Sequence, residues 1–162
     1  MQDYVIELLD TVERATPALL ALGDQTSARR PAPGKWSARE IIGHLVDSAS
    51  NNHQRFVRAR WQDDLIFAGY AQDAWVEAQR YQEAPWDDLV TLWASFNRHL
   101  ARVMAATPES VRTKPHDRHN LRGLAWETMA ADQPATLDDF MRDYVAHLKH
   151  HLGQILPAWR PA

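Results

Sequence analysis

Two histidines near the end of the chain are the residues best placed to do chemistry together. His147 and His151 are spaced i, i+4 in a segment of helical periodicity, which puts both imidazoles on one face, about 5–6 Å apart at Cβ. His44 lies within a second helical segment, between Ile41 and Leu45, and is also expected to point inward. The sequence therefore predicts a metal site of three imidazoles, with open positions left for water or substrate as in catalytic metal sites.

The histidine pair is ordinary by itself, because the chain holds eight histidines and such pairs also occur on solvated faces. The face around the pair is mostly apolar, with Phe140, Tyr144, Leu148 and Ile155 close in angle. A buried polar group without a partner is costly, and a shared metal ion would supply one. The alternative is three separate core histidines, each bonded to a backbone carbonyl.

The other five histidines are weaker candidates. His150 points about 100° away from its neighbour on the helix. His53 and His99 lie on polar stretches and are expected to be solvated. His116 and His119 could form a second ligand set, but their loop context favours a flexible surface turn.

Further polar residues follow His44 along the same helical segment. Ser48, Asn52 and Arg55 lie at i+4, i+8 and i+11, on or near one stripe, and Asp47 lies at i+3. One interpretation is a pocket wall in which Arg55 binds an anionic group, Asn52 binds an amide or carbonyl, and Asp47 is an outer-shell partner of the metal. The alternative is a solvated helix face.

Aromatic residues are frequent for this length. The seven tryptophans are interpreted mostly as core or helix-end anchors: Trp36, Trp61, Trp75, Trp86, Trp93, Trp126 and Trp159. Tyr70 and Trp75 lie in an irregular stretch, so one of them could line a pocket.

Four long helices are expected to position these residues. The first spans 2–22, with Pro17 able to kink or restart it, and a loop follows at 23–35. A capping box of Ser37 and Glu40 starts the second, which runs to about Gln62, and a short helix is expected at 73–81. The third begins near Asp87 and ends at Pro108, and a second capping box, Thr136 with Asp139, starts the last helix, which runs to about Leu156. This predicts an all-α four-helix bundle in one domain, 1–162, with a long, turn-rich connection between helices three and four.

Composition excludes several classes of protein. The chain has 162 residues and no cysteine, which excludes disulfides and thiolate ligands. Its formal net charge is −3, so it lacks the excess of basic residues that binds nucleic acid or an anionic membrane. The first ten residues lack the pattern of a signal peptide, and no apolar run is long enough to span a bilayer. A cytoplasmic location is expected, without nucleic-acid or membrane partners.

Two separated motifs resemble the DinB-like proteins. WSAREIIGHLVDS at 36–48, followed by Asn52 and Arg55, is similar to the second helix of that family, and AHLKHHLGQI at 146–155 is similar to its last helix. The most similar branch is the one assigned to metal-dependent hydrolases, which includes the bacillithiol S-transferases. The resemblance extends over about residues 30 to 156; the stretch from Thr107 to Ala135 matches no pattern of the family.

The resemblance implies a four-helix bundle with a divalent metal, zinc or nickel, held by His44, His147 and His151. Family members commonly form homodimers, with which apolar helix faces here are compatible, although a monomer fits too. The activity implied is transfer of a low-molecular-weight thiol to electrophiles in detoxification or stress. Two alternatives stay open: a hydrolase that uses metal-bound water, with Asp47 or Asp73 as base, and a non-catalytic metal- or ligand-binding stress protein.

Overall fold

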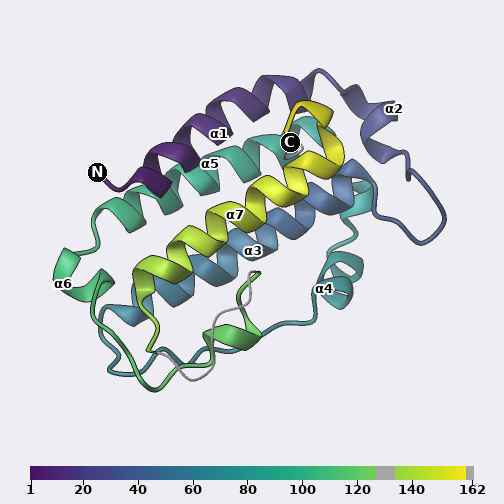
Figure 1. Ribbon diagram of the computed structural model, residues 1–162. Helices are drawn as coiled ribbons and strands as arrows, with labels where there is room; N and C mark the ends of the chain where they lie inside the picture. Colours follow the sequence, from purple (N-terminus) through teal and green to yellow (C-terminus); the bar gives the residue numbers. More distant parts are fainter. Residues whose placement is uncertain (127–133, 160–162) are drawn as a thin grey trace.

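The computed structural model describes residues 1–126 and 134–159. Four long helices lie side by side: α1 (Asp3–Leu20), α3 (Ala38–Ala59), α5 (Trp86–Ala105) and α7 (Leu137–Ile155) (Figure 1). Shorter helices connect them: α2 (Gly23–Ala28), α4 (Gln72–Ala78) and α6 (Glu109–Arg112), with 3₁₀ turns at Tyr81–Glu83, Leu121–Gly123 and Pro157–Trp159. Apart from two isolated β-bridges, residues 1–126 and 134–159 contain no β-structure. The prediction of an all-α four-helix bundle is confirmed.

The chain enters α3 and α5 at the same end of the bundle. Ser37 and Arg39, at the start of α3, both contact Gln82, just before α5. The connection from Arg60 to Pro85 therefore runs back along the bundle, so that α3 and α5 are parallel neighbours (Figure 1). α1 and α7 also start together, because Tyr4 donates a hydrogen bond to Asp138. A long crossover thus lies between the second and third long helices, in addition to the predicted connection between the third and fourth.

Both predicted capping boxes are present. The Ser37 amide donates to Glu40 Oε2 over 2.8 Å, and the Glu40 amide donates to Ser37 Oγ over 3.2 Å. Thr136 and Asp139 exchange the equivalent bonds at the start of α7. Side-chain caps satisfy amides that have no partner within the helix, which fixes where each helix begins. These two helices carry the three candidate ligands.

Several predicted boundaries differ from the structure. The stretch 23–35, expected as a loop, contains α2, because Arg39 binds the carbonyl of Asp24 and holds that turn against α3. α1 continues past Pro17 to Leu20, and α3 ends at Ala59 rather than near Gln62. Short helical turns do occur in the connection before α7; its residues 127–133 lie outside the described residues.

Apolar side chains from all four long helices fill the core. α1 contributes Leu8 and Val12, and α5 contributes Trp93 and Leu100, each 0% exposed. Trp86 donates from its indole nitrogen to the carbonyl of Leu19 over 2.9 Å, which satisfies a carbonyl at the end of α1. No helix among residues 1–126 and 134–159 has the length and apolar character needed to cross a membrane.

Candidate metal centre

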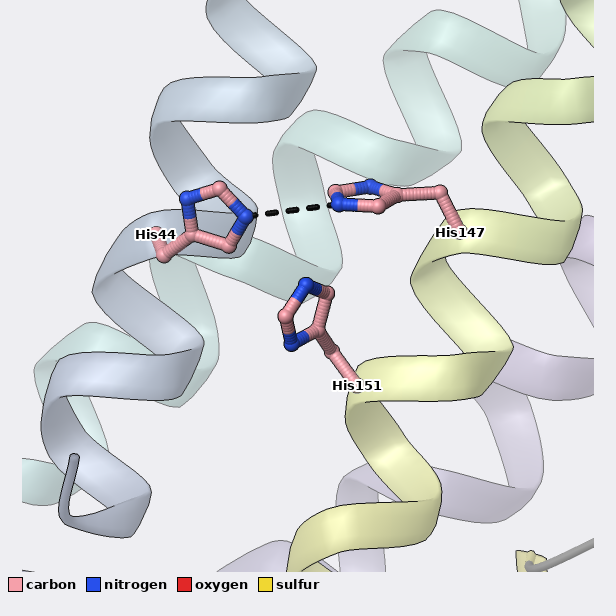
Figure 2. A group of neighbouring side chains, drawn as sticks. All are labelled: His44, His147 and His151. Atoms are coloured by element: carbon pink, nitrogen blue, oxygen red, sulfur yellow. Dashed lines mark hydrogen bonds between the residues drawn. The ribbon is translucent and has the colours of Figure 1, made fainter. Parts of the chain in front are cut away.

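The structure brings together the three histidines selected from the sequence. His44 projects from α3 toward His147 and His151 on α7 (Figure 2). The Nε2 atoms of His44 and His147 lie 3.4 Å apart, and the ring centroid of His151 is 4.8 Å from that of His44 and 4.6 Å from that of His147. One nitrogen from each ring lies within 4.8 Å of the others, close enough to coordinate one ion.

In the described part of the chain, no backbone carbonyl accepts a hydrogen bond from these three rings. Nδ1 of His147 lies 3.5 Å from Ser48 Oγ, and Nδ1 of His151 lies 3.2 Å from Gln154 Oε1. His44 is 1% exposed, and its Nδ1 has no hydrogen-bond partner among residues 1–126 and 134–159. The alternative of three core histidines, each bonded to a carbonyl, is therefore not what the structure contains. Three imidazole nitrogens facing one another, with no acid among them, fit a divalent cation.

Burial and mutual repulsion keep these imidazoles neutral. Loss of water around the ring, with a smaller contribution from His151, lowers the pKa of His44 to about 4. The same causes lower the pKa of His147 to about 3, and burial also lowers the pKa of His151. At neutral pH, the rings therefore carry free lone pairs, as metal ligation requires.

A cavity of about 360 Å³ opens beside the three rings. Its walls include all three histidines, the predicted residues Asn52 and Arg55, and residues of the connection before α7. The solvated-face alternative is wrong for Asn52 and Arg55, which are 7% and 6% exposed. A metal ion held by these three imidazoles beside the cavity would keep coordination positions for water or substrate, as metal ions in catalytic sites do.

Arg55 is a buried cation in this cavity. Nη2 donates to the carbonyl of Ala68 over 2.8 Å, and Nη1 donates to Asn52 Oδ1 over 3.3 Å. Within the part of the chain that the structure describes, Arg55 forms no ion pair with a carboxylate, and burial lowers its pKa. A buried charge without a counterion is unfavourable, so an anionic ligand in the cavity would be attracted to it.

Asp47 faces a different set of partners from those predicted. Its Oδ1 accepts hydrogen bonds from Tyr81 over 2.8 Å and from Gln79 over 2.7 Å, and burial raises its pKa. Its Oδ2 is buried without a partner among the described residues, and Asp47 does not line the 360 Å³ cavity. Asp73, the other acid considered as a base, lies outside this cavity too.

Three cavity residues were missed or only partly anticipated. Asp143 lies one turn before His147, and the series Asp143, His147, His151 at i, i+4, i+8 would have revealed it. Trp126, expected in the core or at a helix end, is 48% exposed and lies beside the site, its centroid 5.8 Å from His147. Tyr70, one of two aromatic residues considered as pocket-lining, does line the cavity, and burial raises its pKa to about 12.

The remaining histidines are not part of the triad, although the ring of His150 lies 5.3 Å from that of His151. The interpretation of His116 as part of a flexible surface turn is wrong, because it is 6% exposed and its Nδ1 lies 2.7 Å from the carbonyl oxygen of Asp63. His53 is half-buried against Phe96 rather than fully solvated, whereas His99 is exposed. His150 points out of the triad, toward Trp126, at a ring distance of 4.2 Å.

Fold and site define a helical-bundle protein with a candidate three-histidine metal centre. The chain belongs to the DinB superfamily, whose family model matches residues 8–155. It is 26% identical over 160 residues, covering 95% of this chain and 82% of the relative, to a Bacillus subtilis (strain 168) protein named "Putative metal-dependent hydrolase YfiT". The solved structure of YfiT, described as an unusual four-helix bundle topology, matches the fold with a TM-score of 0.75 at 18% identity, over 94% of this chain and 81% of that one.

Proposed function

We propose that this protein is a divalent-metal-dependent enzyme that transfers a low-molecular-weight thiol to an electrophile. The proposal rests on one observation: three imidazoles that face one another and a buried arginine, Arg55, line the same cavity. Among residues 1–126 and 134–159, no carboxylate forms an ion pair with Arg55. Small biological thiols commonly carry carboxylate and amide groups. Arg55 and Asn52 supply a charge and a hydrogen-bonding amide for these groups.

Each residue has a separate task in this proposal. His44, His147 and His151 hold the metal, for which zinc and nickel both suit imidazole ligands. A divalent metal bound there would favour the thiolate form of a coordinated thiol. Tyr70 stays protonated because burial raises its pKa to about 12, so its hydroxyl can donate a hydrogen bond to the bound ligand.

The transfer balances without an additional oxidant or reductant. The thiol releases its proton to solvent and its sulfur forms a bond to the electrophilic carbon. The bond from that carbon to its leaving group breaks, and the leaving group departs with the electron pair. The chain's contribution is to hold the sulfur and the carbon within reaction distance, which lowers the entropic part of the barrier.

Hydrolysis is the second candidate, and it is favoured by two observations. The relative YfiT is named as a hydrolase, and Asp143 lines the same cavity as the triad. Metal-bound water with a neighbouring carboxylate could cleave an ester or amide. Asp47 and Asp73, the bases first considered, do not line this cavity.

A kinetic comparison tests the proposal. The zinc- and nickel-loaded protein is incubated with monochlorobimane and a panel of thiols: glutathione, cysteine and 2-mercaptoethanol. We expect metal-dependent conjugation, with Arg55→Met raising KM for the carboxylated thiols by about tenfold or more and leaving 2-mercaptoethanol nearly unchanged. Arg98→Met, at an exposed position on α5 away from the cavity, is the matched control.

Two results would contradict it. Conjugation no faster than the uncatalysed reaction for every thiol, with metal-dependent cleavage of 4-nitrophenyl acetate, would replace it with the hydrolase. Absence of both reactions in metal-loaded protein would leave a non-catalytic binding role.

A further inference from the structure

A second and larger cavity lies on the other side of His151. Its volume is about 670 Å³, and its lining comes from α2, the segment 29–36, the starts of α3 and α4 and the end of α7. The beginning of α3 and the end of α7 lie at the same end of the bundle (Figure 1). His151 and Gln72 line both this cavity and the one that holds Arg55. The metal centre therefore lies at the boundary of two chambers.

The second chamber combines apolar walls with two cations at its margin. Leu22, Ile41 and Ile155 supply apolar surface, and Arg29 and Lys35 supply positive charge. Both cations are exposed and have no ion-pair partner within residues 1–126 and 134–159. Asp73 is the only acidic residue among the described residues that line the chamber, so positive side chains outnumber negative ones there.

Two neighbouring arginines differ from Arg29 because each forms an ion pair with an acidic residue. Arg30 forms an ion pair with Glu40 at 2.5 Å, and Arg39 forms one with Asp24 at 2.5 Å. Arg29 lies in the same stretch of chain, is exposed and lines the chamber, and it forms no ion pair with any described residue. An amphiphilic anion would bury its apolar part against Leu22, Ile41 and Ile155 and leave its charge near the two cations.

We infer that this chamber binds the electrophilic substrate, an apolar molecule that carries a carboxylate or similar anionic group, with its reactive carbon toward His151. This inference rests on the proposed function and assigns its two substrates to separate chambers: the thiol beside Arg55, the electrophile beside Arg29 and Lys35. The bond changes are those of the transfer described above. A hydrolase acting on one substrate plus water has no need of the second chamber.

Binding of a matched pair of probes to the metal-loaded protein tests the inference. Octane-1-sulfonate carries an anionic group that coordinates metals poorly, and 1-octanol is its neutral counterpart. We expect the sulfonate to shift the amide resonances of Thr26 and Gly34 in ¹⁵N-labelled protein. In the double variant Arg29→Ala/Lys35→Ala, its Kd should rise about fivefold or more, while that of 1-octanol stays within about twofold.

Arg58→Ala/Arg98→Ala is the control variant, because it removes two exposed cations that line neither chamber and changes net charge equally. An equal loss of sulfonate affinity in both variants would overturn the inference, as would shifts confined to the chamber of Arg55.

Because binding is measured without turnover, the proposed transferase activity and the proposed second substrate chamber can fail separately. Sulfonate bound at Arg29 and Lys35 without any thiol conjugation would refute the transferase and keep the chamber. If the protein catalyses conjugation but the KM for a carboxylated electrophile is unchanged in Arg29→Ala/Lys35→Ala, the transferase is kept and the chamber assignment is refuted.

Discussion

The bundle has two halves of different character. α1 and α5 pack through apolar side chains, and each contributes a single buried polar residue, Thr11 and Asn97. α3 alone contributes seven of the fourteen buried polar residues among those described, including His44, Asn52 and Arg55. Hydrophobic burial is the dominant favourable term in folding, whereas each buried polar group must find a partner.

This difference indicates a division of labour. Asn97, the buried polar residue of α5, is fully used, since it accepts a hydrogen bond from Tyr144 and donates one to the carbonyl of Trp93. On α3, by contrast, His44 Nδ1 and Asp47 Oδ2 have no hydrogen-bond partner among the described residues. Arg55 forms no ion pair with any carboxylate in the same part of the chain. The indole nitrogen of Trp93 on α5 is also buried without a partner among the described residues, so the two halves differ in the kind of polar group they hold. The α1–α5 half is mainly apolar, whereas α3 with α7 holds imidazoles and charged side chains, of which His44, His147 and Arg55 line the cavity.

The first substitution removes an apolar side chain from the core between α1 and α5 and should lower the free energy of unfolding. Leu8→Ala removes a side chain that is 0% exposed in α1, and the free energy of unfolding should fall by about 2–5 kcal/mol because a cavity forms. Urea unfolding measures this loss, and metal content per protein should stay unchanged under native conditions. Loss of metal in parallel with stability would show that the halves are not separable.

The next effect depends on pH, and it comes from the site half. Burial lowers the pKa of His44 to about 4 and that of His147 to about 3, whereas both titrate near 6.5 when the chain is unfolded. Between pH 6.5 and 4 the unfolded chain therefore binds protons that the folded chain does not. In metal-free protein, the free energy of unfolding should fall on acidification by up to about 1.4 kcal/mol per pH unit for each histidine.

Urea titrations at pH 7.5, 6.5, 5.5 and 4.5 measure this slope. His147→Leu should reduce it, whereas His99→Gln, at an exposed position, should not. The same slope in His147→Leu and in the parent protein would contradict the assignment to the triad.

The smallest predicted effect is the loss of stability caused by a substitution at Gly43 in α3. A Cβ on Gly43 would overlap the ring of Tyr81, which donates a hydrogen bond to Asp47. Gly43→Ala should cost about 1–3 kcal/mol of stability through overpacking, and it should weaken metal binding because His44 is the next residue. Gly123→Ala is the control, since its Cβ would meet nothing within 4 Å. Equal stability of both variants, measured by thermal unfolding, would contradict the packing account.

The sequence predicted the parts that depend on local pattern. The two capping boxes, the four helical stripes and the inward direction of His44, His147 and His151 follow from spacing within each helix. The path of the chain between helices did not follow from spacing. The parallel run of α3 and α5, the burial of His116 and the position of Trp126 depend on long-range contacts made by irregular segments.

Asp47 shows the same limit within the site. Its i+3 spacing from His44 indicated an outer-shell partner, but the hydrogen bonds from Tyr81 and Gln79 come from a segment more than thirty residues later. Helical spacing gives the face of a residue and not the competitors for its hydrogen bonds.

The most direct test of the account is the metal content of purified protein measured together with metal-dependent stability. The chain should bind one zinc or nickel ion per molecule, and a thousandfold excess of metal over Kd should raise the free energy of unfolding by about 4 kcal/mol. His147→Ala should abolish both, and His150→Ala, a neighbour outside the triad, should abolish neither. Full metal retention in His147→Ala would contradict the three-histidine centre.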